Sequence, residues 1–333
     1  MKVLIIGGTG VISSACARLA MTRGHDVTLL CRGQTHRHAV PRGANVLHAD
    51  VRDRRSTRDA LGDRAFDVAV QFIGFLPAHV EQDIELFRGR VRQYVFISSA
   101  SAYQTPPGRL PITEALPLDN PFWQYSRDKI ACEERLLRAH RDEGFPVTVV
   151  RPSHTYDRAL LPVHGGWTIV DRMRRGLPVV VHDDGASLWT LTHQDDFAVG
   201  LVGLLGQERA VGEAFHITSD ETLTWNQIHE IVGRAAGVES TLVHVSSERI
   251  AAFDSSWGAS LLGDKAHSMV FDNTKIKAFV PDFVAAIGYA EAADSQIAWY
   301  DEDPRRQMVS RELDATIERI LADTHAVACV RAT

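Results

Sequence analysis

The chain has 333 residues, of which 45% are hydrophobic and 23% charged, with a formal net charge of -6 and a pI near 6.2. This is the composition of a globular protein, and it excludes an overall basic surface of the kind that binds nucleic acid. The length is sufficient for one large domain with a smaller appended lobe.

The cysteines lie far apart and include no C-x-x-C pair, so we expect neither a zinc site nor a disulfide framework. They are Cys16, Cys31, Cys132 and Cys329. No apolar run approaches the roughly 18 residues of a membrane helix, and the first residues lack the pattern of a cleavable signal. We therefore expect a cytoplasmic protein with no bound metal and no membrane partner.

Short apolar segments rich in valine and isoleucine recur through the first half of the chain. They comprise residues 2–6, 26–30, 45–49, 67–73, 94–98 and 147–151. They do not alternate with polar residues, which is typical of strands buried on both faces of a parallel sheet. The segments between them have helical spacing, as at Ile12, Ala15, Cys16, Leu19 and Ala20, and at Ile130, Ala131, Leu136 and Leu137 within 125–143. This alternation predicts an α/β fold with a Rossmann-type, doubly wound parallel sheet.

The regular pattern fades after residue 155. A short helix from Trp167 should end at Gly176 and Pro178, and residues 179–191 read as a hairpin with Asp-Gly at its turn. A strand follows near 215–219 and a capped helix near 224–237. We predict a dinucleotide-binding domain in residues 1–155, to which part of 185–220 returns. Residues 156–184 and 216–333 should mainly form a smaller mixed α/β substrate-binding lobe.

The first strand runs into the glycine-rich stretch "GGTGVIS" and then a helix. A strand, a tight turn and a helix N-terminus together form an anion site, because free N–H groups and the helix dipole favour negative charge. Ser13 stands where a third glycine is usual, and we interpret it as a small packing residue between helix and strand. The residues expected to hold the pyrophosphate are Gly7, Thr9, Gly10, Val11 and Ile12.

The end of the second strand bears on the choice of cofactor. An acid there would bind the ribose 2′-hydroxyl of NAD, but this chain has Cys31 and Arg32. An arginine without a neighbouring acid can accommodate a 2′-phosphate, which mildly favours NADP, although Arg32 could instead be an ordinary solvated charge. After the third strand, Asp50 could bind the adenine amino group while Val51 packs on the ring.

Tyr125 and Lys129 stand at i and i+4 in "YSRDK", on one face of the expected helix. A nearby ammonium favours the phenolate and should lower the tyrosine pKa. The fifth strand ends at "FISSASAY", and the carboxyl ends of strands carry the ligand in this architecture. Ser98, Ser99 or Ser101 should therefore lie near the Tyr125 hydroxyl.

Together, "GGTGVIS", "FISSASAY", "YSRDK" and "VRPSHTYD" resemble the extended short-chain dehydrogenase/reductase family, the NAD(P)-dependent epimerase/dehydratase group. The resemblance covers nearly the whole chain. Through "GHDVTLLCRG" the sequence is also similar to the branch that includes chloroplast stem-loop RNA-binding proteins.

The resemblance implies that Tyr125 is the general base or acid, that Lys129 binds the nicotinamide ribose, and that Ser99 is the catalytic serine with Ser101 as the alternative. It places Pro152 and His154 against the nicotinamide. The further cofactor contacts that it implies are Phe72, Ile73, Gly74 and Ser98.

Three features bear on the substrate. Ser99-Ala100-Ser101 replaces the Thr-Asp-Glu of the dehydratases, which disfavours elimination. The family's arginines for a sugar-nucleotide diphosphate are missing from "SLWTLTH" and "LLGDKAH", where Lys265 could serve only as a point charge. Aromatic residues near the expected site could stack on a ring or simply pack in the core. The candidate substrate contacts are Phe75, Ser101, Trp123, His154 and Trp189, with Trp167 as a further nearby aromatic.

Two functions follow as hypotheses. The first is an NAD(P)-dependent epimerase or oxidoreductase that transfers hydride at a carbinol carbon of a sugar-nucleotide- or nucleoside-like substrate, with Tyr125 as the base. The second is a non-catalytic nucleotide-sensing or RNA-binding protein of the same fold. The resemblance also implies a homodimer formed by helices near 79–91 and 125–143.

Overall fold

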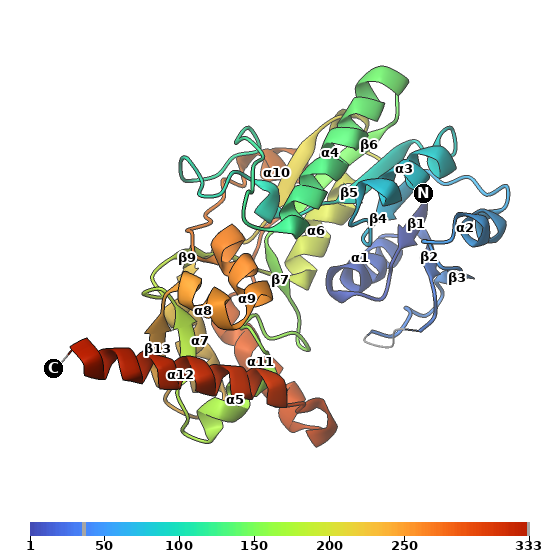
Figure 1. The fold of residues 1–333 in the computed structure, drawn as a ribbon. Helices are drawn as coiled ribbons and strands as arrows, with labels where there is room; N and C mark the ends of the chain where they lie inside the picture. The colour runs from blue at the N-terminus through green and yellow to red at the C-terminus, as the bar shows by residue number, and fades with distance from the viewer. Residues whose placement is uncertain (35–37, 332–333) are drawn as a thin grey trace.

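The computed structural model describes residues 1–34 and 38–331, with side chains up to residue 324. Its main feature is a parallel sheet of seven strands in the order β11-β6-β5-β4-β1-β2-β3. The first six strands are β1 (Lys2–Ile6), β2 (Asp26–Cys31), β3 (Asn45–His48), β4 (Val68–Gln71), β5 (Gln93–Ile97) and β6 (Val147–Pro152). The order reverses at β1, which is the doubly wound arrangement and confirms the predicted fold (Figure 1).

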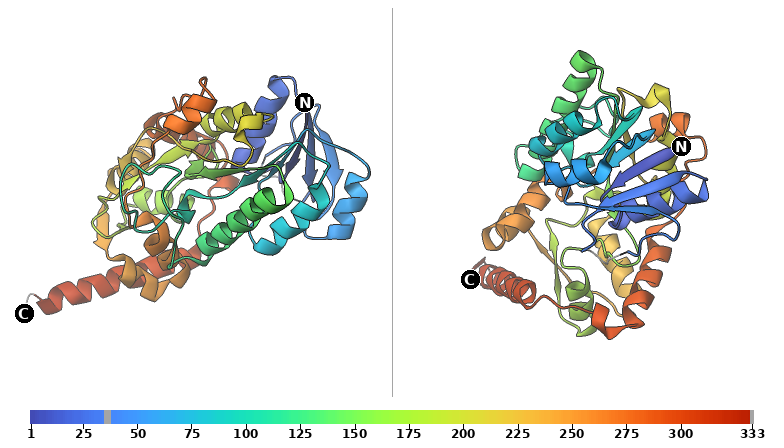
Figure 2. Two further views of the ribbon diagram at one scale, coloured as in Figure 1. Left: turned by 90° about the horizontal axis from the view of Figure 1, so that it is seen from above. Right: turned by 90° about the vertical axis from the view of Figure 1, so that its right-hand side faces the viewer.

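Both faces of the sheet are covered by helices. Along β1, Val3 and Ile5 pack into one core, whereas Leu4 and Ile6 pack into another, because successive side chains of a strand point to opposite faces. Helices α1 (Val11–Thr22) and α6 (Gln194–Leu204) cover the first face. Helices α2 (Arg54–Leu61), α3 (Pro77–Phe87) and α4 (Gln124–Glu143) cover the second (Figures 1 and 2).

The buried face of α4 differs from the expected one. Of the predicted apolar residues only Leu136 is buried, and Ile130, Ala131 and Leu137 remain half-buried. The helix instead buries Ser126, Lys129, Cys132, Glu133, Leu136 and Ala139. Hydrophobic periodicity could not find this face, because two of its members are charged and are satisfied by partners on the sheet.

The seventh strand, β11 (Ala214–Ile217), is the predicted strand near 215, and it extends the main sheet by pairing with β6. The following segment with α10 (Thr274–Phe279) also packs on this side of the molecule. Ile276, Val280 and Phe283 lie in the same hydrophobic core as α1 and α6. Part of the range assigned mainly to the lobe therefore returns to the sheet.

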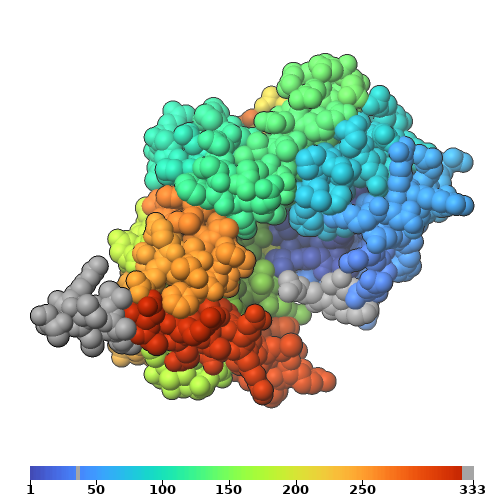
Figure 3. All heavy atoms as spheres, in the orientation of Figure 1, coloured from blue at the N-terminus to red at the C-terminus, as the bar shows by residue number. Residues whose placement is uncertain are grey.

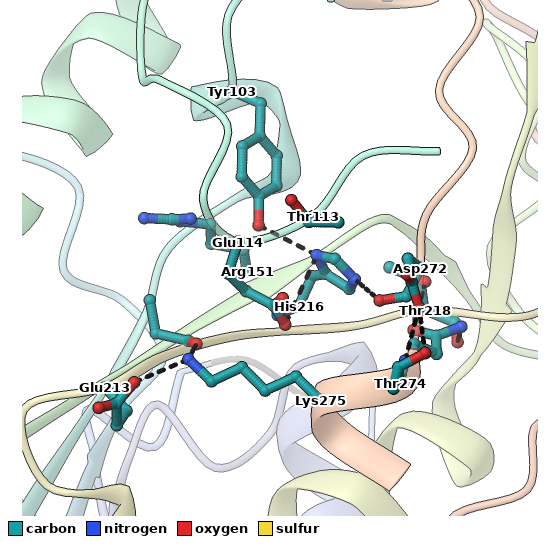
Figure 4. A network of polar contacts seen from close by, with 12 residues as sticks. Tyr103, Thr113, Glu114, Arg151, Glu213, His216, Thr218, Asp272, Thr274 and Lys275 are labelled. Carbon is teal, nitrogen blue, oxygen red and sulfur yellow. Dashed lines mark hydrogen bonds and ion pairs between the residues drawn. The ribbon is translucent and has the colours of Figure 1, made fainter. Parts of the chain in front are cut away.

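A buried polar network joins these late segments to the loop after β5 (Figure 4). The His216 Nε2 donates to the carbonyl oxygen of Asp272 at 2.8 Å, so the neutral ring accepts at Nδ1 from the Tyr103 hydroxyl at 3.0 Å. Nearby, the Lys275 ammonium contacts Glu213 at 2.8 Å. Burial lowers the pKa of His216, which is consistent with a neutral ring in this position. The network fixes β11 against the segment that leads into α10.

The remaining elements form the lobe. Its helices are α5 (Trp167–Arg174), α7 (Trp225–Ala235), α8 (Ser247–Phe253), α9 (Ser255–Ser260), α11 (Tyr289–Asp301) and α12 (Arg311–Arg331). Its strands are β7 (His154–Tyr156), β8 (Val179–His182), β9 (Leu188–Trp189), β10 (Leu191–His193), β12 (Leu223–Thr224) and β13 (Leu242–Val245). Helix α12 crosses the lobe and ends at the periphery of the molecule (Figures 1 and 2). Within the described chain, every helix is too short or too polar to span a bilayer.

In the lobe, the predicted ends of two helices are confirmed, but one predicted strand pairing is wrong. Gly176 adopts a positive φ of 69° just after α5, and Thr224 caps α7 with a reciprocal bond to Gln227, as expected. The predicted hairpin at 179–191 is wrong. The chain does turn at 183–185, but β8 pairs in parallel with β13 and β9 pairs with β12. Distant strands therefore outcompete the adjacent one for these hydrogen bonds.

Candidate functional site

The glycine-rich turn leads from β1 into α1. Gly7 has a φ of 84°, which favours glycine, and its N–H donates to the Leu30 carbonyl at 3.0 Å. A Cβ at this position would lie 2.7 Å from the Ile73 Cγ2 atom. Both the conformation and the close approach therefore require a residue without a side chain.

Ser13 has a more specific role than packing. Its hydroxyl accepts from the Gly10 N–H at 2.9 Å and donates to the Gly7 carbonyl at 2.7 Å, and the side chain is 1% exposed. The hydroxyl thus ties the two ends of the turn together, whereas the sequence had predicted only a small residue between helix and strand.

Replacement of Ser13 by alanine should cost about 1 kcal/mol of free energy of unfolding, because the Gly10 N–H at the start of α1 loses its side-chain acceptor. Chemical denaturation measures this change. Ser14→Ala is the matched control, since the equally buried Ser14 hydroxyl donates to the Val11 carbonyl within the same helix. Equal stability of the two variants would show that the tie across the turn has no energetic role.

A hollow of about 430 Å³ opens beside this turn, at the carboxyl ends of β1, β2 and β3. In the space-filling view, dark-blue atoms from the start of the chain are visible in a recess below the cyan and light-blue atoms (Figure 3). Of the expected cofactor residues, it is lined by Gly7, Thr9, Gly10, Arg32, Asp50, Val51 and Ile73. A hollow against a helix N-terminus, at the carboxyl ends of parallel strands, is where this architecture binds a dinucleotide. Arg32 and Asp50 line it from the ends of β2 and β3.

Arg52 also lines the hollow, although its sequence context did not predict a cofactor contact. Its guanidinium donates to the Ile73 carbonyl, and its backbone N–H donates to the Asp50 carboxylate at 2.9 Å. Burial lowers the pKa of Arg52, and the positive charge of Arg32 acts in the same direction. The signal in the sequence was its position directly after Asp50 and Val51.

Five other expected cofactor residues lie beside the hollow rather than on its wall. Val11 and Ile12 form the first turn of α1, and Phe72 packs partly against the core under the sheet. Gly74 presents its carbonyl to Lys129. The Ser98 hydroxyl is buried and has no hydrogen-bond partner among the described residues.

Tyr125 lies in the first turn of α4, beside the serines that follow β5. Burial raises the pKa of Tyr125, a hydrogen bond with Ser99 opposes this, and the charge of Asp264 raises it further. The Ser99 and Ser101 hydroxyls are 2.9 Å apart, and Ser101 accepts from the buried Ser126 hydroxyl at 2.8 Å. Of the two candidate serines, Ser99 is therefore the one in contact with the tyrosine.

Lys129 is 1% exposed and lies one helical turn beyond Tyr125. Its ammonium donates to the carbonyls of Gly74 and Ile97, both at 2.7 Å, and lies 5.8 Å from the centre of the tyrosine ring. Burial lowers the pKa of Lys129 to about 8. The expected lowering of the tyrosine pKa by this ammonium is not what the structure shows, because burial dominates at Tyr125. One of the three ammonium donors is left for a ligand.

A second cavity, of about 390 Å³, begins at Ser99 and Tyr125 and extends into the lobe. The expected substrate residues Ser101, Trp123, His154 and Trp189 line it, together with Pro152. The cavity is also lined by Lys265, which the sequence offered only as a point charge for a diphosphate. The lining residues that had no predicted role are Ala100, Ser153, Thr155, Leu160, Thr190, Asp264, Met269 and Phe271. Most of these residues could not be predicted, because they lie more than 100 residues along the chain from α4, which carries Tyr125 and Lys129, or stand outside any recognised motif.

His154 and Trp189 form one unit in the wall of this cavity. The Trp189 Nε1 donates to the His154 Nδ1 at 3.1 Å. Burial lowers the pKa of His154 to about 3, so the ring is neutral near pH 7 and carries its proton on Nε2. The ring therefore offers a hydrogen-bond donor to the cavity.

Two aromatic residues lie elsewhere than expected. Phe75 lines the cofactor hollow instead of the substrate cavity, because it follows β4 at the edge shared with β1, and its ring lies 4.9 Å from the Lys129 ammonium. Trp167 stacks on Tyr300 in the core of the lobe, with ring centres 4.7 Å apart. Among the described residues, no group of three or more His, Cys, Asp or Glu side chains is placed to hold a metal ion.

Comparison with known proteins agrees with this architecture. The model of the "NAD dependent epimerase/dehydratase family" matches residues 3–218. The chain is 27% identical to 2'-dehydrokanamycin reductase of Streptomyces kanamyceticus, over 79% of this chain and 72% of that protein. It is 28% identical to the chloroplast stem-loop binding protein of 41 kDa b of Arabidopsis thaliana, over 73% of this chain and 65% of that protein, which confirms the second resemblance.

Solved structures share the fold. UDP-glucose 4-epimerase from Bifidobacterium longum, in complex with NAD+ and UDP, superposes with a TM-score of 0.74 at 18% identity, covering 92% of this chain and all (100%) of that one. The match of the family model over most of the chain confirms the membership predicted from the motifs. The chain thus belongs to the NAD dependent epimerase/dehydratase family and is an NAD-dependent enzyme of the extended short-chain dehydrogenase/reductase type.

Proposed function

We propose that the protein is an NAD(P)-dependent oxidoreductase or epimerase acting at a carbinol carbon of a sugar- or nucleoside-like ring. The observation that carries this proposal is the meeting of Tyr125, Ser99 and the substrate cavity, one helical turn from Lys129. When bound, the nicotinamide supplies the acceptor and donor of the hydride.

Tyr125 takes the proton of the substrate hydroxyl when the carbinol is oxidised and returns it when the carbonyl is reduced. Ser99 donates a hydrogen bond to the phenolate or to the substrate oxygen. Lys129, with a pKa of about 8, is mostly protonated at neutral pH and keeps a positive charge beneath the site. Its remaining donor is directed to the cofactor ribose in this proposal.

The two serines should differ in their effects. Ser99→Ala is expected to lower kcat about 100-fold, because it removes a hydrogen bond made to the reacting groups. Ser101→Ala should cost about tenfold or less, since Ser101 acts through Ser99. Steady-state kinetics of the two variants separates the roles, and a larger loss from Ser101→Ala would reverse the assignment.

A 2′-phosphate at the end of the hollow is part of the proposal, and Arg32 and Arg52 support it. Two arginines line this hollow. Arg32→Ala should therefore weaken NADP binding about 10- to 100-fold and leave NAD binding within about threefold, since a charge-assisted hydrogen bond contributes about 1.5–3 kcal/mol. Calorimetric titration with both cofactors measures this. Arg55→Ala, whose side chain on α2 is 92% exposed, is the control. Equal losses for both cofactors would contradict the assignment.

The fate of the hydride distinguishes two activities. In an epimerase the hydride returns to the same ring, whereas in a net oxidoreductase it leaves with the cofactor. Curated relatives include a reductase and UDP-glucose 4-epimerases. Native mass spectrometry of freshly purified protein tests this: a retained dinucleotide favours epimerisation, and free exchange favours net oxidation or reduction. The mass of a retained dinucleotide also identifies the 2′-phosphate.

RNA binding is a second candidate, because of the likeness to the stem-loop binding protein. The net charge of -6 argues against it. A gel shift with structured RNA at low salt tests it directly, since binding to phosphates is strongest there. The homodimer formed through α3 and α4 stays a prediction, which light scattering tests. The cytoplasmic location also stays a prediction.

A further inference from the structure

The substrate cavity contains a charged pair outside the Ser-Tyr-Lys set. Asp264 and Lys265 are the charged side chains among its described lining residues. They end a single turn of π-helix, η3 (Leu261–Lys265), a local structure that is frequent at functional sites. The turn is held in place because the Lys265 carbonyl accepts bonds from His182 and Ser187, both at 2.9 Å.

The Asp264 carboxylate is nearly buried and lacks hydrogen-bonded partners. Its side chain is 13% exposed, and the nearest cation, the Lys265 ammonium, is 3.8 Å away. It makes no hydrogen bond with the part of the chain that the structure describes. Burial raises its pKa to about 6, and Lys265 opposes this. A carboxylate can accept several hydrogen bonds, and leaving it buried without them is costly, so donors from a ligand would stabilise it.

The Lys265 ammonium is in a similar position. It lies 5.4 Å from the centre of the Trp123 ring and 5.8 Å from that of Trp189, between two aromatic walls of the cavity. Its side chain is 20% exposed. Its three donors make no hydrogen bond to described residues, and they face the same space as the Asp264 carboxylate.

The two charges together select against charged ligands. A diphosphate would gain one lysine but would face a carboxylate beside it, and no arginine stands among the described lining residues to bind it in bidentate fashion. A substrate ammonium would gain Asp264 but would face Lys265. An uncharged ring with neighbouring hydroxyls suits both groups, since one hydroxyl donates to the carboxylate and the next accepts from the ammonium.

We propose that Asp264 and Lys265 bind a vicinal diol of an uncharged ring, so that the substrate is a sugar or similar polyol without a nucleotide diphosphate. The faces of Trp123 and Trp189 cover the ring, and the His154 Nε2–H supplies a further donor. This inference rests on the proposed function, because the same ring carries the carbinol that Tyr125 serves.

The test is binding, measured apart from turnover, by saturation-transfer NMR and calorimetry on the full chain. The probes are methyl glucoside and myo-inositol as neutral diols, glucosamine as a cationic ring, and UDP as the diphosphate. Neutral rings should bind with at least tenfold higher affinity than glucosamine or UDP. Asp264→Asn and Lys265→Met should each weaken neutral-ring binding about tenfold or more. Asp142→Asn, an exposed acid on α4, is the control and should change nothing.

The outcomes separate this inference from the proposed function. Any one of four results would overturn the inference. These are micromolar binding of UDP, a preference for the cationic ring, unchanged binding of the neutral rings by the Asp264 and Lys265 variants, and no binding of either neutral ring. Tyr125→Phe should retain ring binding, so a loss of hydride transfer with binding intact bears on the proposed function alone.

Discussion

Tyr125→Phe should lower kcat about 1000-fold, equivalent to about 4 kcal/mol of transition-state stabilisation, while cofactor affinity changes little. The phenol oxygen is the proton acceptor in the proposed reaction, and phenylalanine fills the same space without it. Steady-state kinetics with the substrate and calorimetric titration with the cofactor measure the two effects. Tyr289→Phe, a buried tyrosine of the lobe, is the control and should keep its activity.

The pH dependence adds a second readout for Tyr125. Burial raises the pKa of the phenol above its ordinary value of 10, so the phenolate fraction grows throughout the accessible range as pH rises. Carbinol oxidation by the wild type should therefore accelerate with pH, and the slope should be absent in Tyr125→Phe. Activity of the variant within threefold of wild type would refute the proposed mechanism.

Glu133→Ala should lower the free energy of unfolding by about 3–5 kcal/mol, because it leaves the buried guanidinium of Arg151 without a carboxylate to balance its charge. Glu133 on α4 is fully buried and Arg151 on β6 is 4% exposed. The pair is bidentate, with Nε–Oε1 at 3.0 Å and Nη2–Oε2 at 2.6 Å. Burial alone would lower the pKa of Arg151, but Glu133 raises it above the ordinary value. Chemical denaturation measures the effect.

Two companion variants make this result specific. Glu81→Ala removes an exposed ion pair with Arg135 on neighbouring helices, and should cost about 1 kcal/mol or less. The double variant Glu133→Leu with Arg151→Met should recover much of the loss, because no charge remains buried. If Glu133→Ala lowered the free energy of unfolding by less than about 1 kcal/mol, Arg151 would have to be stabilised by another side chain or by solvent.

The ion pair connects stability to the site. Glu133 follows Lys129 by one helical turn on the buried face of α4, and Arg151 immediately precedes Pro152 in the cavity wall. The pair thus holds the Tyr-Lys helix against the strand that carries the far side of the site. The same contact explains why α4 buries a face that hydrophobic spacing did not predict.

The sequence by itself determined the elements whose signals are local. Short apolar runs marked the six strands, because a parallel sheet covered by helices requires apolar residues on both sides. The edge strand β3 is the exception in burial, since its residues are half-buried or exposed. The glycine at position 7 marked the turn in the sequence. The structure gives the reason, because the φ of 84° and the close approach of Ile73 leave no place for a side chain. The i, i+4 spacing placed Tyr125 and Lys129 on the same face of a helix, because side chains four residues apart are neighbours on a helix surface.

Only the tertiary structure decided which distant segments meet. The strand at 214–217 could be recognised, but not that it joins β6. The hairpin at 179–191 failed, because β13 and β12 supplied better partners than the adjacent strand. Asp264 had no predicted role, although it lies in the stretch "LLGDKAH", and its place in the cavity with Tyr125 depends on the packing of a turn more than 100 residues away. Local conformation follows from short-range sterics and hydrogen bonding, whereas the contents of the cavity depend on burial energies summed over the whole chain.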